Sequence, residues 1–436
     1  MSSKISVLII GGGAAGLTAA IAACRAGAAV TILEKSQRVG RKILATGNGR
    51  CNLTNIDLDI SHFHGSNPRF AHGALHRFDY DATLEFFHGL GILARVEDGR
   101  VYPLSNQASS VLDVLRYEIE MLGITTEVEA TVKELSLTKG GFAAVTDDGR
   151  VFTAERVIVA TGGMAAPAFG CTGDGYGFAG SFGHTVVQPH PALVQLHLDA
   201  RFLRQIEGVR CEGRAAVVVD GTIVAEDEGE LLFTSYGISG IPVLQISRAA
   251  AHCLQDGKEV MLHLDLLPQV GESELRLLLA ERLRSQAHKG IAFNLVGMLN
   301  HKLAQVLVQE AGIPDIARPA GKITDVQREQ LGSLLKDWRL RVTGTNPWSA
   351  AQTTAGGVDV SQVNPKTMES RLVPGLYFAG EVLDIDGDCG GYNLQWAWSS
   401  GYTAGDAAGQ QRAQLVSTRS HQANSDRGQA GQPSPA

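Results

Sequence analysis

A glycine-rich turn between an apolar strand and a helix constrains the fold of this chain most. In ISVLIIGGGAAGLTAAIAAC, residues 5–24, Gly11, Gly13 and Gly16 spell G-x-G-x-x-G directly after an apolar run. The first glycine permits a tight turn, the second lets the backbone approach a pyrophosphate, and the third lets helix and strand pack closely. AVTILEK follows as a second strand that brings Glu34 to its end, where a carboxylate can bind ribose hydroxyls. The segment predicts one βαβ unit that binds a dinucleotide.

Two other interpretations of glycine-rich segments are weaker. Residues 5–24 carry no charge, as a membrane or export segment would, but three consecutive glycines interrupt the apolar run. Gly175, Gly177 and Gly180 spell a second G-x-G-x-x-G, but no strand leads directly into it. We therefore expect a helix to open there, and only one dinucleotide-binding domain in the chain.

Composition excludes several classes of protein. A chain of 436 residues suggests two or three domains, and its hydrophobic content of 44% with 19% charged residues is typical of a soluble globular enzyme. The formal net charge of −7 argues against a globally basic nucleic-acid binder. The six cysteines form no C-x-x-C pair and no zinc spacing, so we expect a reduced, cytoplasmic chain without a metal or a membrane anchor.

Two further strand-to-glycine turns favour FAD over NAD. RVIVATGG places Thr161 and Gly162 after an apolar run in the middle of the chain. GLYFAGEVLD does the same near the C-terminus with Gly380, Glu381 and Asp384, and an acid at that point can hold the ribityl hydroxyls of a flavin. An NAD-binding domain has no need of a distant third turn, so the sequence predicts bound FAD.

Several segments together resemble the BaiN/RdsA family of FAD-dependent oxidoreductases, also labelled aminoacetone-oxidase-like flavoproteins. The matches include IIGGGAAGLTAA, GRKILATGNGRCNLTN, TGDGYGFAGSFGH and GLYFAGEVLDIDGDCGGYNLQWAWSSG, and they cover nearly the whole chain apart from its tail. The resemblance implies an α/β fold in which a Rossmann-like FAD-binding domain is assembled from both ends of the chain. We expect this domain over residues 1–190 and 354–412, an inserted β-barrel-like and helical substrate or cap domain over 191–353, and a disordered tail over 413–436.

The resemblance also assigns cofactor contacts to particular residues. The loop after Glu34 would run along FAD, with cations beside the pyrophosphate, and the C-terminal glycine loop would place a helix N-terminus near the flavin. The expected cofactor-binding residues, besides those named above, are Ala14, Ala15, Lys35, Gly40, Arg41, Lys42, Gly49, Arg50, Val132, Gly390, Gly391, Tyr392, Asn393 and Leu394.

The family implies a reductase that uses NAD(P)H to saturate an activated C=C bond. The substrate would be a small enone-type molecule or, as in RdsA-like members, a uracil ring of ribosomal RNA that becomes dihydrouridine. The basic runs at 201–214 and 281–290 could form a local RNA-binding patch, although such runs are more often solvated faces. A flavin amine oxidase and a non-catalytic FAD-bound binding factor remain as alternatives, and the oligomeric state is open.

Saturating a C=C bond also requires a proton donor. Cys51, in the GRCN segment, and Cys389, in the C-terminal glycine loop, are the candidate catalytic residues. His190, in QPHPAL, is expected to be structural.

Overall fold

A five-stranded parallel sheet brings both ends of the chain together in the computed structural model, which describes residues 4–410. The strands are β1 (Ser6–Ile10), β2 (Ala29–Leu33), β7 (Thr125–Glu127), β11 (Arg156–Val159) and β20 (Leu376–Phe378), in the order β20-β11-β1-β2-β7. The apolar runs read from the sequence are thus neighbours in one sheet, as predicted. The tail expected over 413–436 lies outside the described residues.

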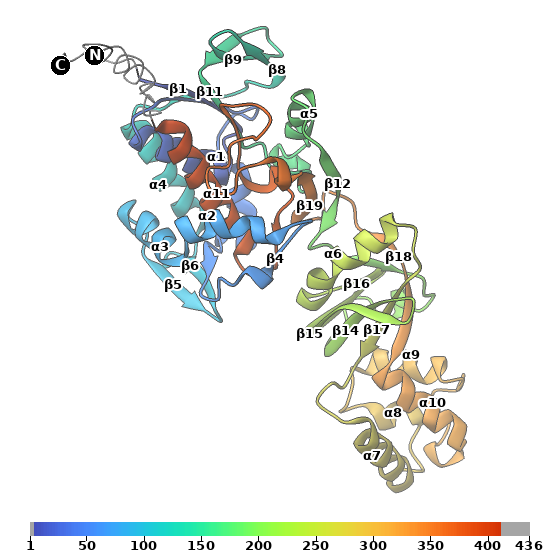
Figure 1. Cartoon of the computed structure of the whole chain (residues 1–436). Helices are drawn as coiled ribbons and strands as arrows, with labels where there is room; N and C mark the ends of the chain where they lie inside the picture. The colour runs from blue at the N-terminus through green and yellow to red at the C-terminus, as the bar shows by residue number, and fades with distance from the viewer. Residues whose placement is uncertain (1–3, 411–436) are drawn as a thin grey trace, which may run out of the picture.

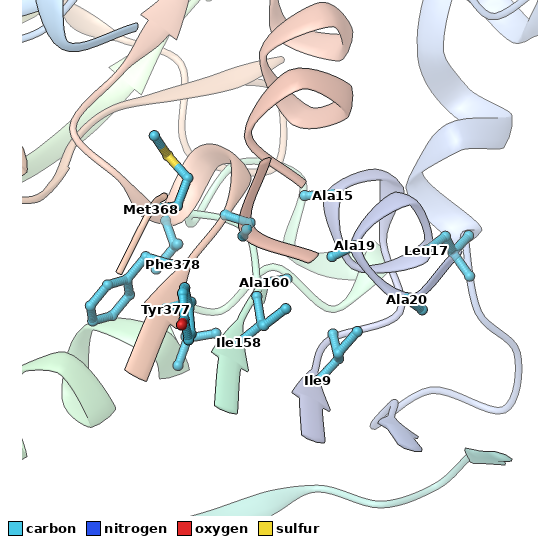
Figure 2. Packing of buried hydrophobic residues seen from close by; sticks show 14 of the residues in the cluster. Ile9, Ala15, Leu17, Ala19, Ala20, Ile158, Ala160, Met368, Tyr377 and Phe378 are labelled. Carbon is cyan, nitrogen blue, oxygen red and sulfur yellow. The ribbon is translucent and has the colours of Figure 1, made fainter. Parts of the chain in front are cut away.

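Helix α1 (Ala14–Arg25) and the last helix, α11 (Tyr392–Gly409), pack directly against each other. A Cβ at Gly401 would lie 2.4 Å from the carbonyl oxygen of Ala15, and a Cβ at Gly405 would lie 2.1 Å from that of Ala19. Figure 2 shows Ala15 and Ala19 on the contact face of α1, above Ile9 of the sheet. Glycine at every fourth position of α11 therefore fixes the C-terminal segment against the first βαβ unit.

Smaller elements surround this core. Helices α2 (His72–Arg77), α3 (Tyr80–Gly89) and α4 (Ala108–Met121) cover it, and β8 (Val132–Thr138), β9 (Gly141–Thr146) and β10 (Val151–Ala154) form an antiparallel sheet. Two small sheets pair β3 (Thr54–Asn55) and β5 (Ala94–Glu97) with β6 (Arg100–Pro103), and β4 (Phe63–His64) with β21 (Asp386–Gly387). The second glycine triplet lies inside helix α5 (Asp174–Ser181), as expected.

The inserted segment forms a closed six-stranded barrel with helices packed around it (Figure 1). Its strands are β13 (Leu196–Leu198), β14 (Arg210–Val219), β15 (Thr222–Thr234), β16 (Gly237–Ser239), β17 (Val260–Asp265) and β18 (Trp338–Thr345). Helix α6 (Ile241–Gln255) packs against the barrel, while α7 (Glu272–Ser285), α8 (Ile291–Leu295), α9 (His301–Glu310) and α10 (Asp325–Lys336) lie at its far end. A separate hydrophobic core fills this part, so the prediction of a barrel-like and helical insertion is confirmed.

Two antiparallel strands connect the two parts: β12 (Val186–Ala192) leads out and β19 (Thr353–Val358) leads back. The expected boundaries, at residues 190 and 354, fall within this pair and stay a prediction. Each helix within residues 4–410 is too short or too polar to cross a membrane.

Candidate functional site: a cleft and an adjoining chamber

A cleft opens where β1, β2 and β11 end. Gly11 has a φ of +104°, and a Cβ there would lie 2.5 Å from the carbonyl oxygen of Ala160. A Cβ at Gly16 would lie 1.9 Å from the carbonyl oxygen of Gly11. Side chains at these two positions would therefore push the turn, the helix and the neighbouring strand apart.

Gly13 serves the cleft in another way. It lines the cleft as the N-cap of α1, and a Cβ there would meet no protein atom within 4 Å. The first amide N–H groups of a helix lack intrahelical partners and lie at the positive end of its dipole. This open space beside a helix N-terminus fits an anionic group such as a pyrophosphate.

Glu34 is held rigidly at the end of β2. Its Oε2 accepts a 2.9 Å hydrogen bond from the N–H of Gly12, and its Oε1 accepts a 2.7 Å bond from the N–H of Ser36. Because the carboxylate also lines the cleft, its remaining lone pairs can accept bonds from hydroxyl groups of a ligand.

The cations of the cleft divide into paired and unpaired groups. Lys42 lies 2.9 Å from Glu381, and Lys35 lies 2.6 Å from Asp174. Burial lowers the pKa of Lys42, but its interactions with Glu381 and Cys171 together outweigh burial, so its pKa is raised and the amine stays charged. Arg38 and Arg41 also line the cleft and have no ion pair among residues 4–410, which leaves two guanidinium groups available to phosphate.

Most of the predicted cofactor-binding residues lie at this cleft. Those that line it are Gly11, Gly13, Ala14, Ala15, Glu34, Lys35, Gly40, Arg41, Lys42, Val132, Thr161, Gly162, Gly380, Glu381, Asn393 and Leu394. That they contact a cofactor stays a prediction.

Other predicted residues lie elsewhere. Arg50, Gly390 and Gly391 line the chamber described next. Gly16, Gly49, Asp384 and Tyr392 line neither cavity.

Two of these side chains have structural partners instead. The carboxylate of Asp384 is buried, burial raises its pKa, and it accepts a 2.9 Å hydrogen bond from the N–H of Ser66. The ring of Tyr392 stacks on His62 with centroids 4.4 Å apart. The positions of these two groups therefore give no support to the cofactor contacts expected of them.

A chamber of about 810 Å³ adjoins the cleft. Its walls come from the loop after Gly40, from β6, from the barrel strand β15, from α6, and from the loop between β21 and α11. The cleft and the chamber share Lys42, Thr46, Phe169, Asn393 and Leu394 as lining residues. The two cavities therefore meet, so that a ligand extended along the cleft would face the chamber.

The chamber carries charges of both signs. Arg50 lies 3.1 Å from Glu97, and its guanidinium stacks 4.1 Å from the ring centroid of Tyr102. Arg210 pairs with Glu230. Arg100 lines the chamber without an ion pair among the described residues, and sequence reasoning missed it because nothing local marks its position.

The two candidate cysteines occupy different environments. Cys51 is 0% exposed within the hydrophobic core, where burial raises the pKa of its thiol to about 12, against a smaller effect of a hydrogen bond with Thr46. Cys389 lines the chamber, and burial raises the pKa of its thiol. Its backbone N–H donates a 2.6 Å hydrogen bond to Oε1 of Gln245. Of the two candidate cysteines, Cys389 lies at the chamber and Cys51 does not.

A cluster beside Cys389 was also missed. Asp388 is one of the residues that line the chamber, and its carboxylate lies within hydrogen-bonding distance of His62 and His64. The available signal was the position of Asp388 inside the GDCGGYN segment and the i, i+2 spacing of the two histidines. Within residues 4–410, no group of three histidine, cysteine, aspartate or glutamate side chains is arranged to hold a metal, and all six cysteines are free.

A glycine turn at the carboxyl edge of a parallel sheet, with a carboxylate after the second strand, defines a Rossmann-type dinucleotide-binding protein. The family model of the HI0933-like protein Rossmann domain matches residues 5–407. The chain belongs to this family, which is the BaiN/RdsA family expected from the sequence.

Two relatives resemble the chain over nearly its whole length. It is 44% identical to a 3-dehydro-bile acid delta(4,6)-reductase of Clostridium scindens, over 92% of this chain and 98% of the relative. It is 34% identical to a ribosomal RNA dihydrouridine synthase of Escherichia coli, over 92% and 96%. A solved 3-ketosteroid delta1-dehydrogenase from Sterolibacterium denitrificans has a TM-score of 0.49 at 12% identity, over 92% of this chain and 99% of that one.

Proposed function

We propose that the chain is an FAD-dependent oxidoreductase that uses NAD(P)H to reduce an activated C=C bond in a small enone-type molecule. The observation that carries the proposal is the junction of the cleft and the chamber at five shared lining residues. Hydride transfer requires cofactor and substrate in contact, and such a junction allows it.

The residues of the cleft fit FAD. The open space at Gly13 beside the α1 N-terminus, together with unpaired Arg38 and Arg41, would hold the pyrophosphate. Glu34 would hold the adenosine ribose. Glu381 lines the cleft at the third strand end, where it would face the ribityl chain while paired with Lys42. When bound, FAD supplies the hydride chemistry, while the protein supplies position, electrostatics and the proton.

A small substrate fits the chamber better than an RNA strand does. Its volume lies in the range of pockets for small molecules. Glu228, Glu230 and Asp388 line it together with Lys42, Arg50, Arg100 and Arg210, so the charge of the lining alone favours neither substrate. The arginines of the expected basic runs are partly neutralised, because Arg214 pairs with Glu228 and Arg284 pairs with Glu281.

The names of the relatives support both substrates in principle. The more similar one is a bile acid reductase, which supports the enone, and the dihydrouridine synthase supports the uracil ring as the second candidate. We propose a cytoplasmic location because all six cysteines are free, as expected of a reducing compartment.

Anaerobic visible spectroscopy tests the proposal. The purified protein should show a flavin spectrum that bleaches on addition of NADPH or NADH and returns on addition of an enone. A flavin spectrum that bleaches with an amine instead would favour the amine oxidase. A flavin spectrum that is bleached neither by NADPH or NADH nor by an amine would favour the non-catalytic binding factor. A protein that cannot be reconstituted with FAD would overturn the assignment of the cleft.

A further inference from the structure

A histidine joins a solvent-facing carboxylate to a carboxylate in the chamber wall. Nδ1 of His62 lies 3.0 Å from Oδ2 of Asp388, and its Nε2 lies 3.3 Å from Oδ2 of Asp57. The side chain of Asp57 is 71% exposed, whereas that of Asp388 is 20% exposed and lines the chamber. The imidazole therefore stands between solvent and the proposed substrate site.

The backbone fixes this arrangement. Strand β4 pairs with β21, and the N–H of Asp388 donates a 2.9 Å hydrogen bond to the backbone oxygen of His62. Tyr392 stacks on the imidazole at an interplanar angle of 19°, and Nε2 of His64 lies 2.7 Å from the other oxygen of Asp388. These contacts fix the imidazole of His62 and the carboxylate of Asp388 relative to each other.

Electrostatics place the proton on the histidine. Burial lowers the pKa of His62, but hydrogen bonds with Asp388 and Asp57 outweigh burial and raise it above its ordinary value. Burial raises the pKa of Asp388, but hydrogen bonds with His64 and His62 outweigh burial and lower it. Both shifts favour an imidazolium beside a carboxylate.

Further charges face this pair. The charge of His62 contributes to lowering the pKa of Asp59, and the charge of Asp388 contributes to raising the pKa of Asp227. Arg100 acts on the neighbouring groups Cys389 and Tyr392. The acids that raise the pKa of His62 are Asp388 and Asp57.

We propose that Asp388 delivers the proton to the substrate and that His62 supplies that proton to Asp388. This inference rests on the proposed function. The two electrons of the C=C π bond form the new C–H bond at one carbon with the proton from Asp388, while the other carbon accepts the hydride supplied by the reduced cofactor. Asp388 takes its proton from Nδ1 of His62, which regains one from solvent. Asp388 is the catalytic residue here, and His62 acts through it.

Single-turnover kinetics test the relay. The holoprotein, reduced anaerobically with dithionite, is mixed with 2-cyclohexenone or with testosterone, and the return of the flavin spectrum is followed across neutral pH in H₂O and in D₂O. His62→Gln should slow reoxidation by about a hundredfold, the scale of general acid catalysis, and should remove the pH dependence near neutrality. Added imidazole should restore part of the rate. His88→Gln, an exposed histidine on α3, should behave like the wild type.

A milder variant avoids any effect on folding. Asp57 is exposed, so Asp57→Asn should leave the fold intact and lower the pKa of His62 by removing one of its two carboxylate partners. The pH profile of reoxidation should therefore move to lower pH. An NMR titration of His62 reports the same shift without any turnover, and Asp388→Asn should lower that pKa further.

The outcomes separate the two proposals. If wild-type protein is never reoxidised by either enone, the proposed function fails, and the relay fails with it. If the wild type is reoxidised while His62→Gln keeps the same rate, pH profile and solvent isotope effect, the function stands and the relay is wrong. A slow His62→Gln variant that keeps the wild-type pH profile would also overturn the relay, because a purely structural defect would explain it.

Discussion

The cleft and the chamber are built from different parts of the chain. The cleft is lined by glycines at strand ends, by the N-terminus of α1 and by carboxylates such as that of Glu34, which accepts a hydrogen bond from an amide N–H. The chamber is lined by residues from the first part of the chain, the barrel, α6 and the C-terminal loop. One cavity is thus defined by local turns, and the other is defined by how two folded parts meet.

This difference separates binding from specificity. The contacts proposed for the cleft are all made to a single cofactor, so the cleft needs one fixed arrangement of backbone and side-chain groups. The chamber instead presents Arg100, Tyr102 and Cys389, whose identity can change without altering the sheet. Variants in the cleft should therefore abolish cofactor binding, and variants in the chamber should change rate or stability while the cofactor stays bound.

Glu34→Arg should give the largest effect. The substitution removes a carboxylate held by the N–H groups of Gly12 and Ser36 and places a long cation where the ribose is proposed to bind. Losing charge-assisted hydrogen bonds should cost about 3 kcal/mol, roughly a hundredfold in the Kd for FAD. The measurement is the flavin absorbance of purified protein and the Kd for added FAD.

The control for this variant is Glu120→Arg, the same change of charge on the exposed face of α4. It should retain the flavin absorbance of the wild type. If Glu34→Arg also retains that absorbance, the position proposed for the adenosine end of FAD is wrong.

Arg248→Met should destabilise the contact between the two folded parts. Nε of Arg248, on α6, lies 3.0 Å from both oxygens of Asp386, whose side chain is 2% exposed. Removing one partner of a buried ion pair costs about 3 kcal/mol, because the other charge stays buried without compensation. Chemical denaturation should show this loss, while Arg25→Met, which breaks the more exposed pair with Glu118, should change little.

The same variant should show a distinctive pH dependence. Burial raises the pKa of Asp386, and Arg248 opposes that rise. Without Arg248 the folded-state pKa rises further, so the folded variant binds a proton more readily than the unfolded chain does. Its stability deficit relative to the wild type should shrink as pH falls and grow as pH rises. A deficit that is constant with pH would show that lost packing, and not the unpaired charge, is its cause.

The sequence was sufficient for the cleft and insufficient for the chamber. The spacing of Gly11, Gly13 and Gly16 predicts the turn, and the second apolar strand ends at Glu34, which lies at the same cleft. No local pattern marks Arg100, and the GDCGGYN segment that contains Asp388 does not show its contact with His62, because both residues reach the chamber through the pairing of distant strands. Asp384 and Tyr392 lie next to segments that line the cleft or the chamber, but their side chains contact Ser66 and His62.

The two cysteines give the smallest expected effects and the finest comparison. Cys51→Ser buries a hydroxyl in an apolar core, which should lower the free energy of unfolding by about 1–3 kcal/mol without changing turnover. Cys389→Ser should keep the cofactor and change reoxidation by less than about threefold, far below the roughly hundredfold loss of a general acid. Stopped-flow reoxidation and denaturation of both variants measure this. Cys389→Ser could instead fold stably but be reoxidised roughly a hundredfold more slowly than the wild type. In that case the thiol of Cys389, and not Asp388, protonates the substrate.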